Sequence, residues 1–170
     1  MAFPLGSVLQ QDGVYTLRFE RHLEHPVSKV WDALTQPACL AKWFAKATVD
    51  LRTGGDFILD FTHSPDVMRG KITRLREYAI LEYTWSELQG EESLVCWELC
   101  PQGPDACLLI LTHSRLTRQV PDFGAGWHTH IDLMVEVLDG SREAFSWDDE
   151  WWRSRLPDYG TGSYPCPPQG

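Results

Sequence analysis

Residues 121–140 read PDFGAGWHTHIDLMVEVLDG, and the architecture of the whole chain follows from this segment. Apolar side chains recur in it at steps of four, four, three and four residues, which is the period of an α-helix, and Gly140 is placed as a C-terminal stop. The residues on this stripe are Phe123, Trp127, Ile131, Met134 and Leu138. The pattern predicts the longest helix of the chain, with an apolar face that another element must cover.

The sequence before this helix mostly alternates between apolar and polar residues, and a period of two indicates strands. Turn residues and polar stretches separate the alternating segments, as in an antiparallel meander, and the Gly54-Gly55 pair indicates a hairpin. The seven predicted strands are residues 14–23, the two strands that flank Gly54-Gly55, and residues 67–75, 79–85, 93–100 and 107–114.

Two short helices are predicted between the first two strands. Pro26 suits the first position of one helix, and Pro37 begins a second helix over residues 38–44. A curved antiparallel sheet cannot bury its inner face alone, and only the helix at residues 123–138 is long enough to cover that face. We therefore predict an α+β fold in which a curved seven-stranded antiparallel sheet wraps around a long C-terminal helix.

The length of 170 residues favours one domain, which we place at residues 1–140. The run Ser146-Trp147-Asp148-Asp149 resembles a capping box and predicts a short helix within residues 141–157. This helix presents more apolar surface than a free helix should, so we expect it to pack on the body or on a partner. Residues 158–170 are rich in proline and glycine and are predicted to form a flexible tail.

The charge of the chain excludes two classes of partner. Lysine plus arginine number 15 and aspartate plus glutamate 24, which gives a net charge of −9, and residues 86–170 carry fourteen of the acidic but five of the basic side chains. Nucleic acids and anionic membranes bind clustered lysine and arginine, so neither is expected as a partner. No apolar run approaches the roughly 18 residues that cross a bilayer. The chain starts without a basic segment before an apolar one, and we expect a cytoplasmic protein.

Five blocks of sequence carry a resemblance to a known family: HPVSKVWDALTQPACLAKWF (25–44), VDLRTGGDF (49–57), LEYTW (81–85), LTHSRL (111–116) and GWHTHIDLMVEVLDG (126–140). In order and spacing they resemble the family related to the activator of the 90-kDa heat-shock chaperone ATPase, within the START-like (SRPBCC) helix-grip superfamily. The resemblance covers about residues 14–140. It implies a helix-grip fold with an apolar cavity between the sheet and the C-terminal helix. That superfamily includes ligand carriers, lipid-transfer domains and polyketide cyclases.

The predicted inward faces bring together apolar and aromatic side chains with a few polar groups, a composition typical of small-molecule pockets. A densely packed core made of the same side chains is an open alternative. The candidate ligand-binding residues are Trp43, Phe57, Phe61, Met68, Tyr83, Trp85, Trp97, Leu109, Leu111, His113, Trp127, Ile131 and Met134.

Neither a metal nor another cofactor is expected. His128 and His130 point about 200° apart on a helix and cannot share one ion, and His128 is expected to pair with Asp132 on the solvent side. The five cysteines lack paired C-x-x-C spacing and are expected to be reduced thiols. Phosphate-loop and dinucleotide-binding glycine patterns are absent from the sequence.

Three functions remain open, in this order of preference. The first is a non-catalytic binding protein for a small hydrophobic or aromatic ligand. The second is a cyclase-like or hydrolase-like enzyme in which His113 and Tyr83 act as acid and base within hydrogen-bond reach of each other. The third is an interaction module related to co-chaperones, in which the acidic half or the helix near residues 147–156 contacts a chaperone, another protein or a second copy in a homodimer.

Overall fold

The computed structural model describes residues 5–86, 92–118 and 120–160 of the chain. Within these ranges eight strands form one sheet in the order β1-β2-β8-β7-β6-β5-β4-β3, with all neighbours antiparallel. The strands are β1 (Ser7–Gln11), β2 (Val14–Leu23), β3 (Lys46–Val49), β4 (Asp56–Asp60), β5 (Val67–Arg76), β6 (Ile80–Trp85), β7 (Ser93–Pro101) and β8 (Cys107–Leu116).

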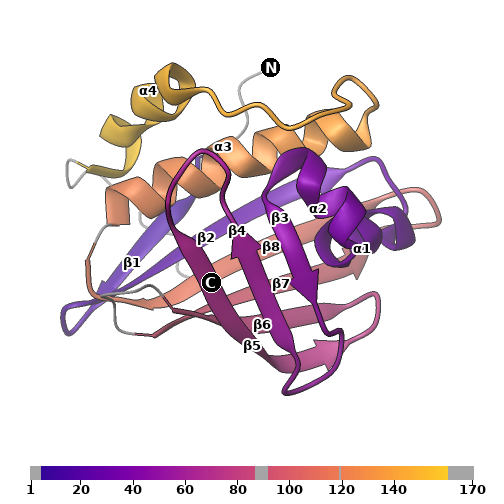
Figure 1. Cartoon of the computed structure of the whole chain (residues 1–170), viewed down its shortest axis with the longest axis horizontal. Helices are drawn as coiled ribbons and strands as arrows, with labels where there is room; N and C mark the ends of the chain where they lie inside the picture. Colours follow the sequence, from indigo (N-terminus) through magenta and orange to yellow (C-terminus); the bar gives the residue numbers. More distant parts are fainter. Residues whose placement is uncertain (1–4, 87–91, 119, 161–170) are drawn as a thin grey trace.

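Four helices complete the described part of the fold: α1 (Val27–Thr35), α2 (Pro37–Trp43), α3 (Val120–Leu138) and α4 (Asp149–Gly160). Helix α3 runs across the concave side of the sheet, and α4 lies on the side of α3 that faces away from the sheet (Figure 1). The molecule therefore has three layers, and the α+β helix-grip prediction is confirmed. None of these helices is long and apolar enough to span a membrane.

The space between the sheet and α3 is filled by large side chains. The rings of Phe57 and Tyr83 stack with their centroids 4.1 Å apart, and the Trp97 indole N–H donates a 3.1 Å hydrogen bond to the Tyr83 hydroxyl. The Trp43 indole N–H donates to the carbonyl of Ala33 at 2.9 Å. Buried indole N–H groups need a partner, and these bonds let tryptophans serve as core residues.

The prediction of seven strands was wrong by one, because β1 was missed. This strand pairs only with β2, through a two-residue turn at Asp12-Gly13 in which both residues have positive φ values of 51° and 79°. An Asp-Gly pair is a strong hairpin signal. The strand itself is short, lies at the sheet edge and has an exposed Leu9 side chain, so its alternation of buried and exposed residues is weak.

The C-terminal helix differs from the prediction at both ends. Asp148, and not Ser146, caps its start, since the Asp148 carboxylate accepts a 2.9 Å bond from the backbone N–H of Trp151. The helix continues through Pro157 to Gly160, whereas the predicted helix lay within residues 141–157. Its last turn is held by Tyr159, which is fully buried. Residues 158–160 therefore belong to α4, and the rest of the predicted flexible tail, 161–170, lies outside the described residues.

Close contact between α3 and α4 depends on Gly124. A Cβ atom at this position would lie 2.4 Å from the Tyr159 ring, closer than any real carbon contact. The Tyr159 hydroxyl accepts a 3.0 Å bond from the backbone N–H of Gly6 and lies 3.0 Å from the Nδ1 atom of His128. Tyr159 thus joins α4 to α3 and to the residues before β1.

The prediction of a solvent-exposed His128–Asp132 pair was wrong, because α4 covers this face of α3. His128 is 3% exposed and Asp132 is 2% exposed. Arg155 of α4 forms an ion pair with Asp132 and stacks its guanidinium 4.6 Å from the ring centroid of Trp151. The polar stripe of α3 therefore binds another helix and does not face water.

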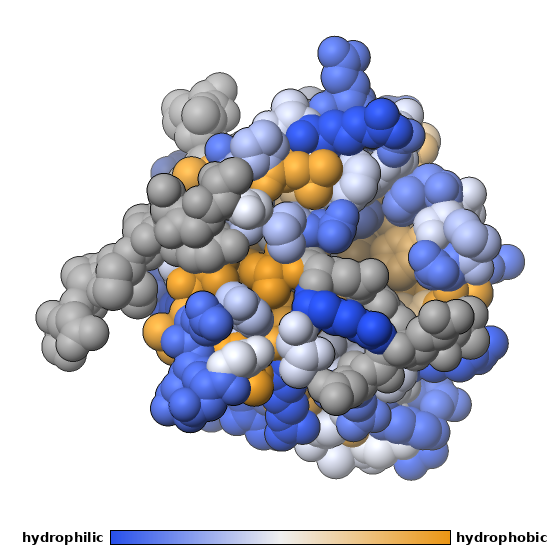
Figure 2. Space-filling model, turned by 90° about the vertical axis from the view of Figure 1, so that its left-hand side faces the viewer, coloured by the Kyte–Doolittle hydropathy of each residue, from blue (hydrophilic) through white to orange (hydrophobic). Residues whose placement is uncertain are grey.

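Exposed apolar surface is concentrated at one sheet edge. On the face in Figure 2, hydrophobic residues (orange) reach the surface in patches between hydrophilic ones (blue). Large hydrophobic side chains that are more than a third exposed in the described part of the chain are Leu5, Leu9, Val14, Leu51 and Tyr78. Three of the five lie in or next to the hairpin of β1 and β2.

Candidate functional site

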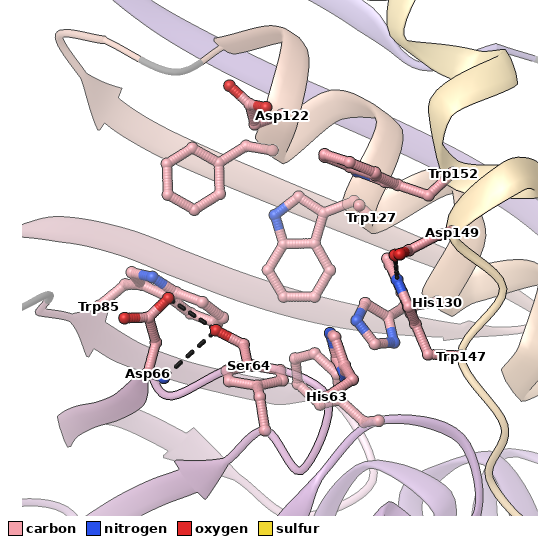
Figure 3. A pocket seen from close by; sticks show the side chains of 14 residues that line it. His63, Ser64, Asp66, Trp85, Asp122, Trp127, His130, Trp147, Asp149 and Trp152 are labelled. Atoms are coloured by element: carbon pink, nitrogen blue, oxygen red, sulfur yellow. Dashed lines mark hydrogen bonds between the residues drawn. The ribbon is translucent and has the colours of Figure 1, made fainter.

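A cavity of about 440 Å³ lies where the N-terminal half of α3 faces the connection between β4 and β5, and it opens to the surface. Four separate stretches of the chain form its wall: the end of α2, the strands and loop around residues 61–85, α3, and the segment that leads into α4 (Figure 3). The lining residues are Phe44, Phe61, His63, Ser64, Asp66, Trp85, Asp122, Phe123, Gly126, Trp127, His130, Trp147, Asp149 and Trp152.

Aromatic rings form the inner wall of this cavity. Trp85 and Trp127 meet edge to face with ring centroids 5.4 Å apart, and Phe44 lies 5.4 Å from Trp127. Phe61 packs edge to face on Phe44 at 5.5 Å. Such edge-to-face contacts fix each ring against its neighbours. The wall is therefore a preformed apolar surface.

The outer wall comes from the segment that leads into α4. Trp147 stacks on His63 with ring centroids 4.4 Å apart and planes 8° apart. The Trp147 indole N–H donates a 2.8 Å hydrogen bond to the Asp149 carboxylate. The ring centroid of Trp152 lies 6.3 Å from that of Trp147. The β4–β5 connection and the C-terminal segment therefore meet across the cavity.

His130 presents one free ring nitrogen to the cavity. Its Nδ1 atom lies 3.1 Å from the backbone carbonyl of Trp43, and a carbonyl can only accept, so Nδ1 carries the hydrogen. The Nε2 atom then has a lone pair, and it has no hydrogen-bond partner among the described residues. Burial lowers the pKa of His130 to about 3, while the bond to Trp43 opposes this shift. The ring is therefore neutral at physiological pH.

The remaining polar lining groups are mainly acidic. Asp66 accepts a 2.8 Å bond from the Ser64 hydroxyl, Asp149 is held by Trp147, and Asp122 lies in the first turn of α3. None of the fourteen lining residues is a lysine or an arginine. Burial lowers the pKa of His63, against the opposing charge of Asp149, so this ring also favours its neutral form. No cluster of three or more potential metal ligands occurs within the described ranges.

The structure places three of the thirteen predicted ligand-binding residues in the cavity wall, namely Phe61, Trp85 and Trp127. The other ten are at most 2% exposed and lie in the core behind the lining residues, without lining the cavity themselves. These ten are Trp43, Phe57, Met68, Tyr83, Trp97, Leu109, Leu111, His113, Ile131 and Met134. Their part in ligand binding stays a prediction.

The two candidate acid and base residues are enclosed. Trp127 donates its indole N–H to Nδ1 of His113 at 2.9 Å, so Nε2 of His113 carries the hydrogen and bonds the Ser93 hydroxyl at 2.8 Å. Burial lowers the pKa of His113 to about 3 and raises the pKa of Tyr83. Both side chains are 0% exposed and neither lines the cavity. A substrate has no access to them in this structure.

Sequence analysis missed most of the polar lining, including His63, Asp66, His130 and Asp149. His63 and Asp66 lie in a connection, where periodicity gives no information on direction. The Ser64-Pro65-Asp66 sequence, which interrupts the alternation between two predicted strands, was the sequence feature that marked this polar connection. The Trp-rich segment after residue 146 was expected to dock, but its docking site could not be inferred from its own pattern.

A curved antiparallel sheet around a long helix, with a cavity beside that helix, defines the START-like helix-grip class. Within this class, residues 24–139 match the family described as Activator of Hsp90 ATPase homolog 1-like protein. The chain belongs to this family, and the resemblance drawn from the five sequence blocks is confirmed.

Solved structures share the whole fold. CalU16 from Micromonospora echinospora is 23% identical with a TM-score of 0.73, covering 91% of this chain and 92% of its own. EF2215 from Enterococcus faecalis, a conserved protein of unknown function, is 17% identical with a TM-score of 0.74, covering 90% of this chain and 89% of its own. PFC0360w, an HSP90 activator from Plasmodium falciparum, is 20% identical with a TM-score of 0.63, covering 76% of this chain and 99% of its own. No curated protein matches the sequence.

Proposed function

We propose that this protein binds a small hydrophobic or aromatic ligand in the cavity beside the N-terminal half of α3. The observation that carries the proposal is the cavity itself: about 440 Å³, walled by interlocked aromatic rings, with one free acceptor at His130. Ligand sites in proteins are typically concave spaces of roughly 300–1,000 Å³ with apolar walls and a few polar groups that orient the ligand.

The aromatic wall supplies enough energy for such binding. Burial of about 200 Å² of apolar ligand surface contributes roughly 5 kcal/mol before the cost of association is subtracted. Roughly 5 kcal/mol corresponds to a dissociation constant of about 0.2 mM before that cost, so a single aromatic ligand is expected to bind with a dissociation constant near the millimolar range. A ligand that also satisfies His130 should bind at the tighter end of that range.

The other two functions have less support from the site. The enzyme hypothesis needs access to His113 and Tyr83, and both are enclosed. The interaction hypothesis, whether with a chaperone or with a second copy, named either the acidic half of the chain or an exposed apolar helix near residues 147–156. Trp151, Trp152 and Leu156 are instead partly buried against the core of their own chain. Light scattering of the full chain over a range of concentrations tests the homodimer.

The binding proposal is tested with aromatic ligands, isothermal titration calorimetry and two matched variants. Trp152→Ala removes a cavity wall, whereas Trp151→Ala removes the neighbouring, similarly half-buried indole, which does not line the cavity. We expect about a tenfold loss of affinity for the first variant, the size of one lost aromatic contact, and little change for the second. Equal effects, or no binding by the native protein, would contradict the proposal.

A further inference from the structure

We propose that the ligand of this cavity is a cation: an aromatic body that carries a protonated amine. The inference rests on the proposed function, since it assumes that the cavity binds a small molecule, and it adds the chemical class of that molecule. Three independent features of the cavity support it: the sign of its charges, the nature of its walls and the hydrogen-bonding state of His130.

The charged groups of the cavity are all negative. Asp66, Asp122 and Asp149 line it, and no lysine or arginine is among the fourteen lining residues. The carboxylates stand on three different sides of the cavity in Figure 3. A concave site lined by one sign of charge raises the local concentration of ligands of the opposite sign. An anionic ligand, such as a carboxylate or a phosphate ester, would be repelled from every side.

Two of the carboxylates are held in place by donors of the protein itself. The Ser64 hydroxyl bonds the Asp66 carboxylate at 2.8 Å, and the Trp147 indole N–H bonds the Asp149 carboxylate at 2.8 Å. These donors orient the carboxylates without neutralising them, because a hydroxyl and an indole carry no charge. The negative charge at the cavity is therefore both fixed in position and available to a cation.

The aromatic walls favour the same type of ligand. The faces of tryptophan, tyrosine and phenylalanine rings attract cations, and tryptophan does so most strongly. Four of the lining residues are tryptophans, and Phe44, Phe61 and Phe123 also line the cavity. A neutral hydrophobic ligand uses only the apolar character of these rings, whereas an organic ammonium uses their negative faces as well.

The free ring nitrogen of His130 calls for a donor. Its Nδ1–H is used by the Trp43 carbonyl, so Nε2 can only accept. His130 is 6% exposed and lines the cavity, and its Nε2 atom is not one of the buried atoms without a partner, so it is accessible from the cavity, where a ligand N–H can bond it. A protonated amine supplies such N–H groups, and a carboxylate ligand supplies none.

A bare metal ion fits this cavity less well than an organic cation. In the described part of the chain, no three or more histidine, cysteine or acidic side chains come together as a metal would require. The carboxylates are distributed around the cavity and do not converge on one point. Such spacing suits a ligand that fills the cavity with its body and places one charged group near the wall.

The experiment uses three probes of matched shape with the full chain: 2-phenylethylamine, 2-phenylethanol and 3-phenylpropanoate, which are cationic, neutral and anionic at pH 7. Affinities are measured by calorimetry at low and at high salt. We expect the amine to bind at least fivefold more tightly than the alcohol and the propanoate to bind most weakly. Added salt should weaken the binding of the amine alone, because ions screen charge–charge attraction.

Variants locate the effect in the cavity. Asp149→Asn and Asp122→Asn should each reduce the affinity for the amine about threefold or more and leave the affinity for the alcohol unchanged. The matched control is Glu150→Gln, since Glu150 is an exposed acid on α4 that does not line the cavity, and it should change neither affinity. An equal loss of affinity for the amine in all three variants would mean that the amine responds to the net charge of the protein and not to the carboxylates of the cavity.

The outcomes separate this inference from the proposed function. Equal binding of amine and alcohol, or tighter binding of the propanoate, would overturn the cationic ligand and leave the binding protein in place. Failure of all three probes to bind would contradict the proposed function, and the inference would fail with it. Selective binding of the amine that each of the two aspartate variants weakens, while the alcohol binds as before, would establish both.

Discussion

The interior around His113 and the cavity around His130 differ in one respect that matters for function. Both histidines are buried, and burial lowers the pKa of each to about 3. His113 uses both ring nitrogens inside the protein, with Trp127 and Ser93, whereas His130 uses only Nδ1. Burial and a lowered pKa are therefore common to both histidines, and only the unused lone pair at the cavity distinguishes His130 as the candidate ligand contact.

The two regions also differ in how their walls are assembled. The interior is bounded by α3 and the regular strands, whose inward side chains are buried against one another. The cavity is bounded by the β4–β5 connection and by the segment around Trp147, and neither has a regular period. Space for a ligand arises where irregular segments replace strands as the neighbours of α3.

The largest expected effect is a loss of stability in acid, to which both regions should contribute equally. In the unfolded chain histidines titrate near 6.5, while His113 and His130 stay neutral in the folded chain down to about pH 3. Below pH 6.5 the unfolded state binds more protons, so the free energy of unfolding should fall by up to roughly 3 kcal/mol per pH unit for the pair. Urea denaturation at pH 7, 6 and 5 measures this.

The range from pH 7 to 5 isolates the histidines, because carboxylates titrate mostly below it. Burial also lowers the pKa of His128 to about 3, so three histidines contribute to the slope, and His113→Gln and His130→Gln should each remove about a third of it. An unchanged slope in either variant would show that the histidine replaced there does not stay neutral in the folded chain.

Removal of an indole from each region should give unequal losses of stability. Trp97→Ala leaves a hole in the filled interior and should cost about 3–5 kcal/mol. Trp152→Ala at the half-buried cavity wall should cost about 1 kcal/mol, because the site already borders open space. Chemical denaturation of both variants compares the two regions directly, and equal costs would mean that the cavity wall is as tightly packed as the interior.

Replacement of each histidine by phenylalanine should also destabilise the interior more than the cavity, but the difference in stability between the two variants should be smaller than for the tryptophans. His113→Phe leaves the Trp127 indole N–H without its acceptor and leaves the Ser93 hydroxyl with only its bond to the Trp85 carbonyl, and it should cost about 2–4 kcal/mol. His130→Phe affects only the Trp43 carbonyl and should cost about 1–2 kcal/mol. The free energy of unfolding from urea titrations distinguishes them. A more costly His130→Phe would indicate a structural role for its Nε2 atom.

The smallest effect is expected at the helix that carries the outer cavity wall. Tyr159→Phe removes the hydroxyl that bonds the Gly6 amide and His128 and should cost about 1 kcal/mol. Hydrogen exchange of the Gly6 amide should accelerate, while amides in the interior strands should keep their rates. Acceleration throughout the sheet would mean that α4 and the interior unfold as one unit.

Much of the fold could be predicted from periodicity, because regular elements repeat their pattern over many residues. Residues 14–23 were predicted as a strand with the bounds that β2 has, and α3 was predicted to within three residues at its start. The edge strand β1 was missed, since its exposed side chains leave little alternation to detect.

The candidate site was less predictable for two physical reasons. A pattern tells which side chains point inward, but it does not tell whether they meet or leave space, so thirteen residues were assigned to a cavity that three of them line. The acceptor at His130 depends on a bond to the Trp43 carbonyl, 87 residues away. Neither the space between inward side chains nor a hydrogen bond between distant residues can be inferred from the pattern of one segment.

The glycine at position 124 sets the interhelical distance between α3 and α4, because it leaves the Tyr159 ring room to seat against the α3 backbone. The same helix carries Trp152, and the segment before it carries Trp147, so the position of one boundary of the cavity depends on a contact elsewhere in the molecule. Among relatives with this fold, a larger residue at the equivalent position would move the helix outward and widen the entrance. The width of the cavity entrance thus depends on a residue that does not line the cavity.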